Sequence, residues 1–281
     1  MADRTDHCNG NHSRGRIYCV DHRIEYFPEG ITQIEESQFR DRYDIDNVEI
    51  PDGVTSIGDC AFWGCHSLFG ITIPDSVTSI GDSAFAGCTS LHHIMLPDSV
   101  TSIGDNAFDR CEWLGFITIP DGVTSIGNYA FRFCKQLSSI TIPESVTSIG
   151  YNAFECCSSL ASITIPENAT WIGADDFAAF SGCSSLTSIK IPDSVTGIGD
   201  WAFNDCSSIT GITIPDGVTS IGEFAFCDCT SLTSITIPDS VTRIGDEAFM
   251  GCKSITVTVT PGSFAETYCR EKGLEYRYAE N

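Results

Sequence analysis

One proline recurs at a fixed spacing through most of this 281-residue chain, and this period constrains the fold more than any other feature. The recurring residues are Pro51, Pro74, Pro97, Pro120, Pro143, Pro166, Pro192, Pro215, Pro238 and Pro261. Each step is 23 residues, except that the step from Pro166 to Pro192 is 26. A fixed period of this size indicates a solenoid, in which each repeat buries its apolar face against its neighbours.

Each repeat divides into three parts, as residues 71–93 illustrate. The alternating β-branched residues Ile71 and Ile73 predict a short strand, and Pro74 with the aspartate after it predicts a turn. Residues 82–88 then read Asp-Ser-Ala-Phe-Ala-Gly-Cys, which we interpret as a single helical turn capped by the aspartate. The sequence thus predicts rungs of parallel strands joined by tight turns.

The pattern Leu-x-x-Ile-x-Ile-Pro-x-x-Val-x-x-Ile-Gly-x-x-Ala-Phe-x-x-Cys, as in residues 68–88, resembles the Treponema-type (BspA-like) leucine-rich repeat. The resemblance covers about residues 28–281. It implies an α/β leucine-rich-repeat solenoid, shaped as a horseshoe or arc, with a parallel β-sheet on the concave face and short helical or 3-10 turns on the convex face. Members of that family are mostly protein-binding or adhesive surface proteins.

Three segments follow from the period. Residues 1–27 form an N-terminal tail and cap, in which residues 16–20 and 23–27 alternate as two short strands that could pair. Residues 28–260 hold about ten repeats, the first degenerate, with a three-residue insertion at 174–179. Residues 261–281 form a C-terminal cap, with a helix from a serine cap at Ser263 to a glycine stop at Gly273 and then a last strand. The valines before this cap are one position out of phase, so we expect their strand to bulge or slip by one residue.

The charge balance excludes some partners. The chain has 38 Asp and Glu residues against 15 Lys and Arg, a net charge of −23. Such a chain repels phosphate backbones and anionic bilayers, so we expect no nucleic-acid binding and no membrane insertion. The first 30 residues contain no apolar run, so no signal peptide is visible, and we expect a cytoplasmic protein. The family resemblance implies the alternative of a secreted or cell-surface protein.

Cysteine recurs with the repeat, three residues after a recurring phenylalanine: Cys65, Cys88, Cys111, Cys134, Cys157, Cys183, Cys206, Cys229 and Cys252. We interpret these residues as small buried side chains rather than disulfides or metal ligands. Separately, Cys8, His12, Cys19 and His22 have zinc-ligand side chains and are the candidate metal ligands, although their spacing matches no known zinc motif. A Cys8–Cys19 disulfide and a disordered tail are the alternatives.

Two rows of carboxylates also follow the period. One comes directly after the prolines, and the other, which is partial, contains Asp59, Asp82, Asp105, Asp200, Glu223 and Asp246. Turn and cap hydrogen bonds account for most of them. Calcium bridging between rungs is the alternative, which would suit an adhesin-type surface protein.

The candidate binding site lies where the repeats differ from one another. Positions beside the strands that are otherwise small or hydroxyl-bearing carry Phe69, His92, His93, Met95 and Phe116. The 23-residue register stacks residues 70, 93 and 116, and likewise residues 72, 95 and 118. Exposed aromatic clusters mark partner sites, so we predict protein binding here. We place Trp63, Trp113 and Trp201 on the convex side or at its edges.

The sequence offers no candidate catalytic residue, because most nucleophile and base candidates recur once per repeat in a structural role. We therefore predict a non-enzymatic, monomeric protein–protein interaction scaffold without a cofactor, which binds a protein partner through the concave face. The alternative is a cell-surface adhesin-type protein stabilised by calcium.

Overall fold

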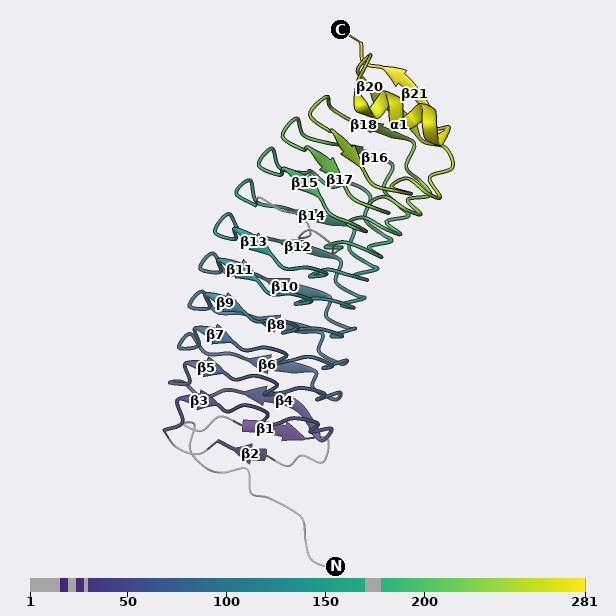
Figure 1. Ribbon diagram of the computed structural model, residues 1–281. Helices are drawn as coiled ribbons and strands as arrows, with labels where there is room; N and C mark the ends of the chain where they lie inside the picture. Colours follow the sequence, from purple (N-terminus) through teal and green to yellow (C-terminus); the bar gives the residue numbers. More distant parts are fainter. Residues whose placement is uncertain (1–15, 20–23, 28–29, 170–177, 281) are drawn as a thin grey trace, which may run out of the picture.

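The computed structural model describes residues 16–19, 24–27, 30–169 and 178–280, and in them the chain winds into an elongated column of stacked rungs that bends in its C-terminal half (Figure 1). A typical rung contributes a three-residue strand such as β6 (Gly70–Thr72) and, after the Pro-Asp turn, a two-residue strand such as β7 (Ser79–Ile80). The predicted solenoid of parallel strands is confirmed, and the horseshoe curvature stays a prediction.

The strands form two sets, which we call the long ladder and the short ladder. The long ladder contains β4 (Ile45–Glu49), β6, β8 (His93–Met95), β10 (Phe116–Thr118), β12 (Ser139–Thr141), β14 (Ser162–Thr164), β16 (Gly211–Thr213), β18 (Ser234–Thr236) and β20 (Thr256–Val259). The short ladder contains β3 (Gln33–Ile34), β5 (Ser56–Ile57), β7, β9 (Ser102–Ile103), β11 (Ser125–Ile126), β13 (Ser148–Ile149), β15 (Gly197–Ile198), β17 (Ser220–Ile221) and β19 (Arg243–Ile244). The alternating residues of each repeat predict one strand per rung, so the short ladder was not predicted.

Both ends of the column carry added structure. At the N-terminal end, β1 (Arg16–Cys19) pairs antiparallel with β2 (Ile24–Tyr26), as predicted for the two alternating segments. It also pairs antiparallel with β4, which the sequence did not predict. At the C-terminal end, β20 pairs with β18 at a step of 22 residues, Ile235 facing Val257, which confirms the expected slip. Helix α1 (Phe264–Lys272) then leads to β21 (Glu275–Tyr278), which pairs parallel with β20.

The caps of α1 are also confirmed. The Ser263 side chain accepts a hydrogen bond from the backbone N–H of Glu266, and Gly273 ends the helix in the left-handed conformation at φ 69°. These are the side chain and the backbone conformation that helix ends favour.

The turn opposite the long ladder is not the predicted single helical or 3-10 turn. In residues 81–88 the odd-numbered Ser83, Phe85 and Gly87 donate their backbone N–H to the next rung at 2.7–2.8 Å, while Ala84, Ala86 and Cys88 donate within the turn. Ser83 also has a φ of 55°. A helix directs all its N–H groups along its own axis, so a segment that shares every second N–H with a neighbouring rung cannot be helical.

The core is one row of stacked rings with aliphatic residues around it. Ten phenylalanines, from Phe39 to Phe249, stack in succession with ring centroids 5.1–5.7 Å apart. The largest spacing, 5.7 Å, flanks Phe180 on both sides. In the same rung residues 186–191 form no strand, so the long ladder lacks a strand between β14 and β16; β10 and β12 also belong to separate sheets.

Candidate functional site

The five predicted partner-binding residues lie on three adjacent rungs of the long ladder. His93 is in register with Phe116 on one side and with Gly70 on the other, and Met95 lies between Thr72 and Thr118. The register predicted from the period is therefore confirmed. In the same register positions the later described rungs carry serine, glycine, alanine, threonine or lysine. The aromatic and histidine side chains are thus confined to one part of the ladder.

Direct ring contacts join four residues of this region, while Met95 and Phe116 lie beside them by register. The Phe69 ring lies 4.5 Å from the His92 ring and 6.2 Å from the His93 ring, measured between centroids. The Trp113 ring stacks on His92 at 5.4 Å with an angle of 22° between the planes. We call Phe69, His92, His93, Met95, Trp113 and Phe116 the aromatic patch.

Trp113 is a member that the sequence analysis did not assign to the site. Its own register column, with Ser90 before it, differs from the columns of the other members, and only the length of its side chain brings it to His92. Its variable position in an otherwise regular repeat was the one available signal. Trp63 and Trp201 have other partners: the Arg40 guanidinium lies 4.3 Å from the Trp63 ring, and Trp201 stacks on Phe224.

The four large apolar side chains of the patch are exposed. The exposed fraction is 77% for Met95, 58% for Phe116, 55% for Trp113 and 44% for Phe69. Exposed apolar side chains in one place lose water readily when a partner covers them, which makes such clusters favoured binding sites.

A small hollow adjoins the patch at its N-terminal side. It has a volume of about 180 Å³ and is lined mainly by Asn47, Glu49, Gly70, Thr72 and His93. The glycine opens it: a Cβ on Gly70 would lie 3.1 Å from Oδ1 of Asn47 and 4.0 Å from the His93 ring. Glu49 is exposed and in register with Thr72. A carboxylate, an amide and an imidazole therefore surround a space without a side chain at its centre.

The recurring cysteines have a structural role, as predicted. Their thiols are free and buried, and each donates a hydrogen bond to the backbone carbonyl of the phenylalanine in the preceding rung, for example Cys111 Sγ to Phe85 O at 3.2 Å. Burial raises the pKa of the Cys111, Cys157 and Cys206 thiols. A protonated thiol inside a dry core is a poor nucleophile and a poor metal ligand.

The partial carboxylate row is also structural where the structure describes its bonds. Asp59, Asp82 and Asp105 each accept a hydrogen bond from the backbone N–H one rung further on, at 2.7–2.8 Å. Asp200 does the same toward Glu223. These oxygens replace a missing backbone acceptor between rungs.

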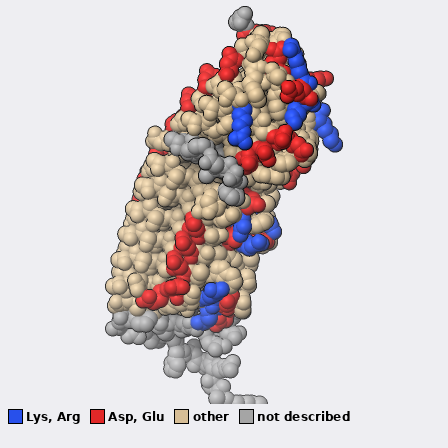
Figure 2. Space-filling view, viewed as in Figure 1, with Lys and Arg blue, Asp and Glu red and all other residues tan. Residues whose placement is uncertain are grey.

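Figure 2 shows that acidic side chains outnumber basic ones on the face in view.

Metal and catalytic chemistry find little support. Among the residues that the structure describes, no group of three or more His, Cys, Asp or Glu side chains is arranged to hold a metal ion. The predicted zinc candidates Cys8, His12 and His22 lie outside the described residues, and of Cys19 only the backbone, in β1, is described.

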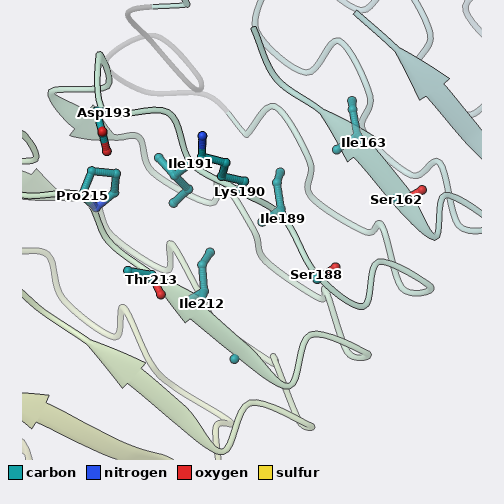
Figure 3. Close-up of a pocket in the computed structure, with 11 residues that line it drawn as sticks. Ser162, Ile163, Ser188, Ile189, Lys190, Ile191, Asp193, Ile212, Thr213 and Pro215 are labelled. Atoms are coloured by element: carbon teal, nitrogen blue, oxygen red, sulfur yellow. The ribbon is translucent and has the colours of Figure 1, made fainter. Parts of the chain in front are cut away.

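A larger open groove of about 560 Å³ lies where the long ladder is interrupted (Figure 3). Its polar lining includes Ser188, Lys190 and Asp193. The Lys190 ammonium forms an ion pair with Glu167. Among the described residues that line the groove, no nucleophile is hydrogen-bonded to a base, as covalent catalysis requires. In the described part of the chain, no helix has the length and hydrophobicity needed to cross a bilayer.

Comparison with known proteins agrees with the architecture. The family model described as BspA type Leucine rich repeat region matches residues 19–135, 113–179 and 176–269. A leucine-rich repeat protein from Bacteroides ovatus is 30% identical, with a TM-score of 0.72 over 90% of this chain. A second, from Eubacterium ventriosum, is 29% identical, with a TM-score of 0.56 over 79% of this chain. The chain covers 64% and 62% of those two chains.

A third structure shares the fold at lower identity. The Leucine Rich Repeat protein of Treponema pallidum is 23% identical, with a TM-score of 0.52 over 97% of this chain and 99% of its own. Comparison with curated protein sequences gives no match. The family model covers well over half of the sequence and agrees with the stacked parallel rungs, so the chain belongs to the BspA-type leucine-rich repeat family.

Proposed function

We propose that this chain is a non-enzymatic scaffold that binds a protein partner through the aromatic patch on the long ladder, the face that we infer to be concave. The observation that supports this proposal is the confinement of six large or aromatic side chains to three adjacent rungs. The core does not need them, because their positions are filled by small or hydroxyl-bearing residues in most other rungs. The fold therefore gives no structural reason for the patch.

Two further features favour a scaffold. The ring contacts within the patch limit the rotamers of its side chains, so a partner meets a surface that is already ordered. The β1–β2 pair lies at the N-terminal end of the column and the α1–β21 segment lies at its C-terminal end. Without them, the end rungs would be open to stack on another copy of the chain. We therefore infer that the chain acts as a monomer with its patch free. The proposal does not include calcium binding, because the carboxylates of the partial row already accept backbone hydrogen bonds from the next rung.

The test compares two double variants of the full chain. His93→Ala with Phe116→Ala removes the centre of the patch, while Ser139→Ala with Ser162→Ala changes the same register in the next two rungs. Immobilised wild-type and variant proteins would capture partners from cells that produce the chain, and each captured protein would be purified and its Kd measured. Loss of two central side chains should weaken binding about 30-fold or more.

The control variant should bind like the wild type, and both variants should keep the wild-type thermal midpoint, since the substituted side chains lie outside the core. Equal Kd values for the patch variant and the wild type, with every partner tested, would contradict the proposal.

A further inference from the structure

We propose that the partner segment docked on the aromatic patch is basic, and that one of its arginine side chains enters the hollow between Asn47 and His93, facing the Glu49 carboxylate. This inference rests on the proposed function, since it names the chemistry of the partner at the same site. Three observations support it: the charge around the patch, the shape and lining of the hollow, and the chemistry of the rings beside it.

The charge around the patch is negative. Residues 43–109 contain ten acidic residues and no lysine or arginine. Many cations elsewhere in the described chain already have carboxylate partners, such as Arg132 with Asp109 and Lys135 with Glu112. At the edge of the patch, Oδ1 of Asp46 is buried and has no hydrogen-bond donor. A basic segment supplies the positive charge that this part of the chain lacks, and attraction of this kind speeds and selects association.

The hollow suits the head of an arginine side chain. Its volume of about 180 Å³ is too small for a folded element but large enough for a planar guanidinium and part of its stem. The carboxylate of Glu49 and the amide oxygen of Asn47 are acceptors, and guanidinium has five donors in a fixed plane. Gly70 forms the floor, so the head could approach the backbone closely.

The rings beside the hollow favour arginine over lysine. The guanidinium is planar and weakly hydrated, and it stacks on aromatic faces while it donates hydrogen bonds from its edges. His93 lines the hollow and makes an edge contact with Phe69. The chain already uses this contact elsewhere, because the Arg110 guanidinium lies 4.6 Å from the Phe133 ring.

Peptide selection tests the inference directly, because it does not require the natural partner to be identified. A displayed library of random 12-residue peptides would be selected on the full chain, with removal of peptides that also bind the His93→Ala, Phe116→Ala variant. We expect the remaining peptides to carry arginine, and their affinity to fall as salt is raised. Replacement of the key arginine by citrulline, which keeps the shape and removes the charge, should weaken binding about tenfold or more.

Two single variants then locate the arginine. Glu49→Gln should weaken the arginine peptides about tenfold and leave their citrulline forms unchanged. Gly70→Phe fills the hollow with a side chain that the ladder already accepts at Phe116, so it should preserve folding and lower the affinity while adding apolar surface.

The outcomes separate the two proposals. Patch-dependent peptides without basic residues, or arginine peptides indifferent to Glu49→Gln and Gly70→Phe, would overturn the arginine inference and leave the patch as a binding site. A library that yields no patch-dependent peptide would overturn the proposed function and this inference with it.

Discussion

The spacing of the rungs depends on a glycine that directly follows every short strand except β3, and Gly104 allows this dependence to be tested. A Cβ at Gly104 would lie 2.7 Å from the carbonyl carbon of Gly81, 2.8 Å from the backbone nitrogen of Asp82 and 2.5 Å from its Oδ1. Real Cβ atoms essentially never approach other atoms within 3.0 Å. Two of these atoms are backbone, so Gly104→Ala must push neighbouring rungs apart.

The expected cost follows from three contributions. Overpacking against a rigid neighbour costs about 1–3 kcal/mol. The displaced Asp82 carboxylate also accepts the backbone N–H of Asp105 at 2.8 Å, and weakening that bond adds about 1 kcal/mol. The alanine returns about 0.4–1 kcal/mol by restricting the unfolded chain. The sum predicts that Gly104→Ala lowers the free energy of unfolding by about 2 kcal/mol.

Gly115→Ala is the matched control, in the same repeat. A Cβ there would meet only the carbonyl oxygen of Gln136, at an ordinary 3.9 Å. The unfolded chain is restricted equally in both variants, so the control should be unchanged or more stable by up to about 1 kcal/mol. The difference between the two variants therefore isolates the contact between rungs.

Equilibrium urea unfolding, followed by circular dichroism and tryptophan fluorescence, measures both free energies. Trp113 lies in the same repeat as the substitution and Trp63 lies two repeats before it, so fluorescence reports on this part of the column. A solenoid transmits a local change to its neighbours, and coincident transitions by the two probes would show that the whole column is measured. Two variants that differ by less than about 0.5 kcal/mol would refute the view that this glycine sets the spacing.

Two further predictions concern pH. Burial raises the pKa of inner thiols such as Cys111, so above about pH 8.5 the folded state keeps a proton that the unfolded state releases. The free energy of unfolding is therefore unaffected by this thiol below about pH 8.5 and falls by up to about 1.4 kcal/mol per pH unit per thiol as the pH rises further. Urea unfolding between pH 7.5 and 10 under reducing conditions should show this loss, with a shallower slope for Cys111→Ala, and equal slopes would contradict it. The pKa of Glu266 is lowered by the Gly262 backbone N–H, the Tyr278 hydroxyl and Arg270. The ionised carboxylate therefore stabilises the folded state above about pH 4.3, and this stabilisation is lost as the pH falls further. The protection factors of the α1 amides, which already correct for the slower intrinsic exchange at acid pH, should therefore fall between pH 6 and pH 3.5 in the wild type but not in Glu266→Gln. Parallel behaviour of the two proteins would argue against the role of this carboxylate.

Periodicity predicted the long ladder because its strands contain the only clear alternation of β-branched residues in the repeat. The short ladder was missed for a matching reason: a two-residue strand such as β7 is too short to show a period of two. Its pairing depends on Ser79 and Ile80 meeting their equivalents one rung away. Nothing in a single repeat carries that information.

The wrong prediction was the helical turn, and its cause lies between the rungs. Asp-Ser-Ala-Phe-Ala-Gly-Cys has the composition and the cap of a short helix, so local propensity favours that interpretation. The N–H groups of Ser83, Phe85 and Gly87 instead bond the next rung. A contact 22 residues away thus overrides a local preference, as tertiary contacts commonly do for such short segments.

At the candidate site, the repeat register predicted which backbone positions are neighbours but not every side-chain contact. The 23-residue period correctly placed His93 beside Phe116, because a register fixes which backbone positions meet. It does not fix how far a side chain extends, so Trp113, in another column, was not connected to His92. The hollow forms because Gly70 has no side chain and because Asn47 and His93 lie on either side of it. Substitutions that leave the repeat intact can thus create a binding surface jointly, and the proposed partner contact should be sensitive to pairs of residues that the period alone treats as unrelated.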